Sequence, residues 1–417
     1  MRISTAQLHA QGLAGMLGRQ QEIARTQQEL ITGNKLTRAA QDPAGAASAQ
    51  RIDHALASLE QFERNSGLVE HRLRLQEGAL GDAGDTLTRA RELALQGNNA
   101  SLSDGDRTML VAELKALQAQ MLGIANRDDG NGRQLFAGSR DGVTPFALSG
   151  GNVSYAGDDG QNQVDIAPGL AVADTDSGSE VFLRVRAGTG EVRGAADPTN
   201  TGRAVLQATS VTDSAQWNGA ALRLEFTGPD SYDVLDAGGT VLSSGTYESG
   251  DSIDVGGVTL RITGEPAAGD GFDVQRAPNQ DVFTTLQRLT DAMSAPATTD
   301  AERARRDNII SESLADITSA QDHLLRLRAD TGARLSAVDA AADTREAGEV
   351  SMSDTLSSLR DVDFAEAASK LTLQLTALEA AQSTMMRVQG LSLFDRLRGG
   401  VFKHTLSLPT LALQGRD

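Results

Sequence analysis

Apolar residues recur with a helical period at both ends of the chain. Near the N-terminus, Met16, Ile23 and Leu30 fall seven residues apart, and Gln20 and Gln27 occupy the alternate positions four residues after Met16 and Ile23. A seven-residue repeat with two inward positions predicts a helix that packs along another helix. The predicted helix–helix contact is narrow, and glutamines occupy two of its five inward positions.

The same pattern returns near the C-terminus. Phe364, Leu371, Leu378 and Met385 are again seven residues apart, and the alternate positions hold Ala368, Leu375, Gln382 and Gln389. The simplest interpretation pairs residues 10–31 with this stretch of the same chain. A pair of a few turns is marginal alone, so we expect identical subunits to supply further helices. The assembly seam predicted on this basis consists of Met16, Ile23, Leu30, Phe364, Leu371, Leu375, Leu378 and Met385.

The glutamines of this pattern have two interpretations that the sequence leaves open. A buried polar side chain at an inward position costs stability but restricts register and partner. The alternative is that the glutamines lie at a wet edge of the helix pair.

A helical texture continues inward from both ends. Gly33 and the Asp42-Pro43 pair break the first helix, and a second is predicted from about Gly45 to Leu95. Ser103 is a suitable N-cap for a third helix, since two aspartates follow it in the first turn. Helical spacing resumes at about residue 281 and extends through the long stretch 300–347.

Residues 141–280 have a different texture. Short runs such as VFLRVR, ALRLEF and IDVGGVTLRIT alternate with Gly- and Asp-rich turns, and the segment holds 22 of the 43 glycines. Such runs predict antiparallel strands. The LDAGGTV stretch predicts a hairpin turn, because Gly238 and Gly239 can take positive φ. A turn-rich stretch near 195–200 predicts a division into two small subdomains.

These textures define an α+β fold, in which terminal helices pair into a rod and a β domain is inserted in the middle. The predicted domains are a terminal coiled coil (1–41 with 361–397), a helical rod (42–140 with 281–360) and a β-rich outer domain (141–280). Residues 398–417 contain Pro409 and no helical seam. We predict that they form a disordered extension.

Charge and composition exclude several classes of partner. The net charge is −18, and residues 141–280 carry 20 acidic against 7 basic side chains. This charge argues against duplex nucleic acid and anionic membranes as partners. The absence of cysteine excludes disulfides and thiolate metal sites. The sequence contains no run of about 18 apolar residues, so it predicts no membrane-spanning helix.

Residue patterns for enzymatic chemistry are weak. The stretch DTDSGSE at 174–180 faintly resembles a calcium loop, but it lacks the central Asp-Gly pair and the distal Glu. We interpret it as a solvated acidic turn. The five histidines have no metal-ligand spacing, and no nucleophile motif occurs. The sequence therefore predicts no catalytic, cofactor-binding or metal site, and a protein that is not an enzyme.

Several ordered motifs carry a resemblance to the flagellin superfamily of bacterial flagellar axial proteins. They are LITGNKLTRAAQDPAG (30–45), GNNASLSDGDRTMLVAELKALQAQM (97–121), NRDDGNGRQLFAGS (126–139), RADTGARL (328–335) and LRDVDFAEAASKLTLQLTALEAAQ (359–382). The start MRIST and the ending LSLFDRL (391–397) are similar to those of hook-associated members, as is the β module at 224–274. Members usually stop shortly after this ending, whereas this chain continues for 20 residues.

The resemblance implies a structural role outside the cell. Such a protein is exported unfolded through the flagellar export apparatus, with a chaperone holding its C-terminal segment. It then polymerises between the first hook-associated protein and the filament, its terminal helices forming an inner tube. Two other functions stay open: flagellin itself, the filament subunit, and a secreted adhesive or lectin-like protein. Clustered exposed aromatics would favour the last.

Overall fold

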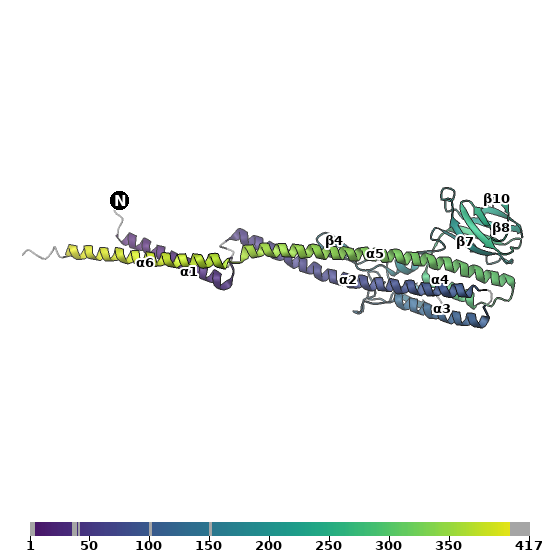
Figure 1. Ribbon diagram of the computed structural model, residues 1–417, viewed down its shortest axis with the longest axis horizontal. Helices are drawn as coiled ribbons and strands as arrows, with labels where there is room; N and C mark the ends of the chain where they lie inside the picture. The colour runs from purple at the N-terminus through teal and green to yellow at the C-terminus, as the bar shows by residue number, and fades with distance from the viewer. Residues whose placement is uncertain (1–4, 36–39, 41, 100–101, 150–151, 401–417) are drawn as a thin grey trace, which may run out of the picture. The chain divides into compact units, whose positions relative to one another are not determined.

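The computed structural model describes residues 5–35, 40, 42–99, 102–149 and 152–400. In chain order, long helices precede and follow a set of antiparallel strands, so the predicted α+β class is confirmed (Figure 1). The helices are α1 (Thr5–Thr32), α2 (Pro43–Gly97), α3 (Asp104–Ala125), α4 (Val282–Ser294), α5 (Asp300–Arg360) and α6 (Phe364–Gly400). Residues 401–417, most of the predicted extension, lie outside the described residues.

The chain divides into two compact units. One contains the residues up to Leu59 and from Glu346 onward, and the other runs from Glu60 to Arg345. The division falls inside α2 and α5 rather than at a loop. The predicted division between coiled coil and rod lay near residues 41 and 361, where the chain turns. Turns in the sequence indicate where a helix ends. They do not indicate where, along one long helix, the residues it packs against change from one compact unit to the other.

Four helices build the core of the larger unit. In α4, Val282, Leu286, Leu289 and Met293 recur at three- and four-residue spacing, and all four are buried. They pack with buried apolar residues of the neighbouring helices, which are Leu80 and Leu87 of α2, Leu114 and Met121 of α3, and Ile310 and Ile317 of α5. The predicted N-cap of α3 is confirmed, because the Ser103 side chain accepts a hydrogen bond from the backbone N–H of Asp106 at 3.2 Å.

The first part of the predicted β domain belongs to this helical core. Here β1 (Phe146–Ser149) pairs with β2 (Asn152–Tyr155), and a π-helix, η1 (Ser179–Leu183), precedes β5 (Val185–Arg186). Phe146 lies 5.6 Å from Phe182 and 5.4 Å from Phe283 of α4, measured between ring centroids. The prediction of a single outer domain over 141–280 is therefore wrong, since these aromatic side chains find their apolar partners on the helices.

A second hairpin lies against the helices through its own small cluster. It consists of β3 (Gln163–Ala167) and β4 (Leu170–Ala173), and it buries Ile166 and Val172 against α2 and α5. The acidic turn that follows is buried, not solvated as predicted, with Asp174 1% and Asp176 2% exposed. Asp174 pairs with Arg72 of α2, and this cation, about a hundred residues away in sequence, makes the burial possible.

Residues 192–276 form a separate two-sheet domain, called the β domain below. One sheet has the order β10-β9-β8-β13-β6 and the other β11-β12-β7. The strands are β6 (Val192–Ala196), β7 (Val205–Val211), β8 (Leu222–Gly228), β9 (Ser231–Asp236), β10 (Val241–Thr246), β11 (Ser252–Val255), β12 (Val258–Thr263) and β13 (Gly271–Arg276). The predicted hairpin turn joins β9 to β10, with Gly239 at φ +77°. The predicted division near 195–200 falls inside this domain, because β6 already pairs with β13.

The β domain should be removable without loss of the helical core. Its ends meet where the Ala277 N–H donates to the Glu191 carbonyl at 2.9 Å, and its apolar core is separate. Replacing residues 192–276 with a short Gly/Ser linker should leave the rest folded with a cooperative melting transition, as followed by circular dichroism, because the apolar core of the helices is untouched. A replacement of 145–276 is the comparison. It also removes Phe146 and Phe182, and each buried Phe contributes about 3–5 kcal/mol, so that protein should not fold stably.

An acid-sensitive contact holds the start of the β domain. The hydroxyl and backbone N–H of Thr199, together with the Arg223 guanidinium, lower the pKa of Asp197 from 3.8 to about 2. Because the folded state favours the carboxylate, its stabilisation is complete above pH 4 and is lost between about pH 4 and pH 2. We expect Asp197→Asn to lower the free energy of unfolding by about 1–2 kcal/mol at pH 7 and by little at pH 2.

This expectation can be measured selectively. Trp217 is the chain's only tryptophan and packs against the β-domain core, so its fluorescence reports urea unfolding of that domain. If the difference in free energy of unfolding between wild type and Asp197→Asn stayed constant from pH 7 to pH 2, the stabilising role of the Asp197 carboxylate would be contradicted.

Candidate functional site: the paired terminal helices

Helices α1 and α6 pack side by side and antiparallel, and together they are called the terminal pair (Figure 1). At one end, a Cβ on Gly12 would stand 3.1 Å from the sulfur of Met385. At the other end, a Cβ on Gly33 would stand 3.9 Å from the Phe364 ring. The N-terminal half of α1 therefore lies against the C-terminal half of α6.

Two backbone hydrogen bonds join the segment after α1 to the segment before α6, at one end of the terminal pair. The Val362 N–H donates to the Gly33 carbonyl at 2.9 Å, and the Lys35 N–H donates to the Arg360 carbonyl at 2.6 Å. Gly33 has φ +71°, a conformation that ends a helix at little cost only for glycine. Asp363 caps α6, since its carboxylate accepts bonds from the N–H groups of the residues two and three positions on. The predicted break at Gly33 is confirmed.

Six of the eight predicted seam residues face the partner helix. Ile23 is buried, and the five others are half-buried, namely Met16, Leu30, Leu371, Leu378 and Met385. These residues occupy the first position of the seven-residue repeat in each helix. The structure brings them together within one chain.

The second inward position differs from the predicted one in both helices. It lies three residues after the first, at Thr26, Gln374 and Ala381, rather than four residues after. Leu375 is consequently 42% exposed, and Phe364, at the start of α6, is 60% exposed. Within the single chain, the described glutamines Gln20, Gln27 and Gln382 are exposed and do not lie between α1 and α6. The wet-edge interpretation holds for these three within a single chain.

The seven-residue pattern missed several contact residues of the terminal pair. Gly12 allows Met385 to approach closely, and Thr26 is buried with its hydroxyl bonded to the Glu22 carbonyl at 3.1 Å. Gln374 faces α1 with its Oε1 atom buried and unpaired. Glycine within a helix was a usable signal for close approach, but the two polar residues gave none.

The outer surface of the terminal pair is unusually apolar. Seven large apolar side chains are 42–84% exposed, and they are Leu13, Leu17, Ile31, Phe364, Leu373, Leu375 and Met386. A groove of about 400 Å³ runs beside Met16 and Met385 and is bounded by Leu13, Leu17 and Met386. A second groove of about 450 Å³, on the side of Gly12 and Gly15, shares the same two methionines. Helices with apolar grooves between them are suited to receive further helices.

This surface offers packing rather than chemistry. Within the described ranges, no cluster of three or more His, Asp or Glu side chains could hold a metal ion. Over the same residues, none of the helices combines the length and the hydropathy that crossing a bilayer requires. The site can act by binding other apolar helices along its length.

Comparisons with known proteins match both ends of the chain. Residues 3–141 match the family described as bacterial flagellin N-terminal helical region, and residues 314–396 match the bacterial flagellin C-terminal helical region. These two regions contain α1 and all but the last four residues of α6. The terminal pair thus defines a flagellar protein of the flagellin type.

Longer matches identify the branch. The crystal structure of Xanthomonas campestris FlgL is 43% identical, with a TM-score of 0.70 over 73% of this chain and 99% of that chain. The flagellar junction protein FlgL from Legionella pneumophila is 30% identical, with a TM-score of 0.67 over 75% of this chain and 100% of that chain. The flagellar hook-associated protein 3 of Salmonella typhimurium is 23% identical over 95% of this chain and 99% of its own length. This chain belongs to the FlgL family, the flagellar hook-associated protein 3 family.

Proposed function

We propose that this chain is a structural junction protein of the bacterial flagellum, which connects the hook to the filament by polymerising through its terminal helices. The observation that carries the proposal is the apolar outer surface of the terminal pair. Monomeric proteins rarely expose so many large apolar side chains on two neighbouring helices unless a partner covers them. Solved relatives include a flagellar junction protein that matches 75% of this chain over its own full length.

The eight seam residues divide into two roles under this proposal. The six that face inward, Met16, Ile23, Leu30, Leu371, Leu378 and Met385, hold α1 against α6. Phe364 and Leu375 face outward with the other exposed apolar side chains and contact neighbouring copies. The domain proposal follows: the terminal pair forms the inner tube, and the β domain stays at the outside.

The proposed partners are those of an axial protein at the hook–filament junction. The chain assembles with its own copies, with the first hook-associated protein below and with flagellin above. An export chaperone and the export apparatus deliver it, and it works outside the cell. The net charge of −18 is unfavourable for nucleic acid or an anionic membrane. A mechanical role of this kind requires no enzymatic activity.

The two alternative functions are less well supported. Flagellin shares the terminal helices, but matches along nearly the full length are to hook-associated protein 3. A lectin-like function needs clustered exposed aromatics. Tyr247 of the β domain is buried, and Trp217 and Tyr232 pack against the same core.

Deletion of the gene tests the proposed function. Electron microscopy of the deletion strain should show hooks without filaments, and flagellin should accumulate in the medium. Reintroducing the gene should restore filaments and swimming. Filaments of normal length and number on the deletion strain would refute the junction function.

A further inference from the structure

The β domain meets the helices through a polar joint. Apolar residues on the two sides form separate buried clusters, one in the helices with residues 135–185 and one within 192–274. The chain passes between the two sides twice, and the crossings lie next to each other. There β5 pairs with β14 (Asn279–Gln280), and the Ala187 N–H donates to the Pro278 carbonyl at 2.9 Å. One narrow ladder by itself resists rotation poorly.

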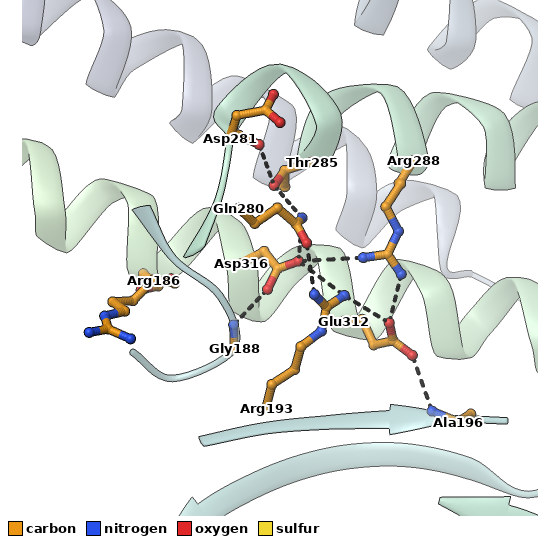
Figure 2. A network of polar contacts seen from close by, with 11 residues as sticks. Arg186, Gly188, Arg193, Ala196, Gln280, Asp281, Thr285, Arg288, Glu312 and Asp316 are labelled. Atoms are coloured by element: carbon orange, nitrogen blue, oxygen red, sulfur yellow. Dashed lines mark hydrogen bonds and ion pairs between the residues drawn. The ribbon is translucent and has the colours of Figure 1, made fainter. Parts of the chain in front are cut away.

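A buried ionic network spans this joint (Figure 2). Arg193 of β6 reaches α5, where its Nη2 atom lies 3.5 Å from Glu312 and 3.8 Å from Asp316. Arg288 of α4 contacts the same two carboxylates at 2.8 Å and 3.8 Å. Glu312 and Asp316 are 8% and 3% exposed at the side chain, and Arg193 is 12% exposed. Two cations thus face two anions; Arg193, Glu312 and Asp316 are largely shielded from solvent, whereas Arg288 is 33% exposed.

The network also fixes backbone from both sides of the joint. Glu312 accepts a bond from the Ala196 N–H of β6 at 3.2 Å, and Asp316 accepts one from the Gly188 N–H at 2.6 Å. Gln280 links Arg193 to Asp316 through bonds of 2.7 Å and 2.9 Å (Figure 2). Separation of the two sides would take Arg193 and the Ala196 N–H away from the two carboxylates, and losing such partners is costly for charges in a site of low dielectric.

Packing around Arg193 leaves open space. Two spaces, of about 40 Å³ and about 290 Å³, lie between the β domain and α5, and Arg193 and Glu312 line both of them. Close-packed apolar contact would by itself fix the relative orientation. Here polar contacts fix the orientation instead. Asn308 of α5 adds two of them, since it accepts a hydrogen bond from the Leu206 N–H at 2.7 Å and donates one to the Ala204 carbonyl at 3.0 Å.

We propose that Arg193, Glu312 and Asp316 form a latch that sets the orientation of the β domain, and that opening the latch lets the folded domain rotate about the β5–β14 ladder. The inference concerns the single chain and does not depend on the proposed junction function. The orientation of the β domain relative to α5 would then be set by a few ionic contacts and not by a continuous apolar core.

Distances between spin labels test the latch on the full chain. The protein has no cysteine, so Ser244→Cys in β10 and Asp322→Cys in α5, both exposed, introduce two labels on opposite sides of the joint. Pulsed electron paramagnetic resonance should give a narrow distance distribution with the native latch. Arg193→Gln and Glu312→Gln should each widen it about twofold or more, because alternative orientations become populated.

A second arginine of the β domain supplies the matched control. Arg223 bonds Asp197 and Asp273 entirely within the domain, so Arg223→Gln should leave the distribution as narrow as wild type. Trp217 fluorescence should show a folded β domain in every variant. Wild-type width in both latch variants would overturn the proposal. Equal widening in Arg223→Gln, or loss of the β-domain fold in Arg193→Gln, would also overturn it, because either result assigns these arginines to stability alone.

Discussion

A strain carrying Leu373→Asp should lose its filaments while the purified monomer melts as the wild type does. Leu373 is 73% exposed on the outer surface of α6, so a carboxylate there meets only water in the single chain. Such surface substitutions change stability by about 0.5 kcal/mol or less. In the proposed assembly, each copy would lose about 1.5–3 kcal/mol of burial and would also bury an unpaired charge. Motility in soft agar and electron microscopy of hooks measure the outcome.

Two controls isolate the effect. Leu373→Met keeps the apolar character and should swim normally. Leu325→Asp places the same charge at a 58% exposed leucine of α5, outside the terminal pair, and should also swim normally. Normal filaments on the Leu373→Asp strain would show that this face of α6 is not an assembly surface.

Leu378 provides the complementary comparison. It is half-buried and faces α1, so Leu378→Asp should weaken the terminal pair already in the monomer. Hydrogen exchange of α1 and α6 should then rise in Leu378→Asp and stay unchanged in Leu373→Asp. The two leucines lie on the same helix, so comparing their variants distinguishes folding of the terminal pair from its assembly with other copies.

The largest loss of monomer stability is expected from Arg72→Met. Arg72 is fully buried, and its guanidinium lies 2.9 Å from both Asp129 and Asp174, which are 1% and 2% exposed at the side chain. Burial raises the pKa of Asp129, but bonds from the N–H groups of Asn131 and Arg133 and from Arg72 outweigh it and hold the pKa below 3.8. Removing the arginine leaves two buried carboxylates uncompensated, at a cost of about 3–5 kcal/mol.

Thermal unfolding followed by circular dichroism measures this loss. A decrease of about 10 °C in the melting temperature is expected for a unit of this size. Arg89→Met is the matched control, because Arg89 pairs with Glu92 and Glu113 at the surface and such pairs contribute about 0–1 kcal/mol. Equal melting temperatures for the two variants would contradict the assigned role of Arg72.

Local pattern predicted the elements of this protein well. Helical spacing located the terminal helices, the Ser103 cap began α3, and the glycine pair marked the turn between β9 and β10. These features depend on residues close in sequence, which is why they can be read without a structure. The seven-residue repeat also identified the first inward position of the terminal pair, because a period by itself fixes which residues share a face.

Positions that depend on a distant partner could not be read in this way. Residues three and four places after Ile23 both lie near its face, and only the packing of α6 selects Thr26 over Gln27. Phe146 and Phe182 lie in segments with a strand-like pattern, yet both pack against Phe283 of α4.

The sequence by itself determined the α+β class, the paired helical ends and the flagellin-type character of the chain, since all of these follow from local periodicity and ordered motifs. Only the tertiary structure decided which charges are buried. Asp174 reads as a solvated turn residue until Arg72 of α2 is placed against it, and Arg193 reads as an ordinary strand residue until Glu312 and Asp316 of α5 are placed against it. The desolvation of a charge depends on everything packed around it, and no neighbour in sequence reports that.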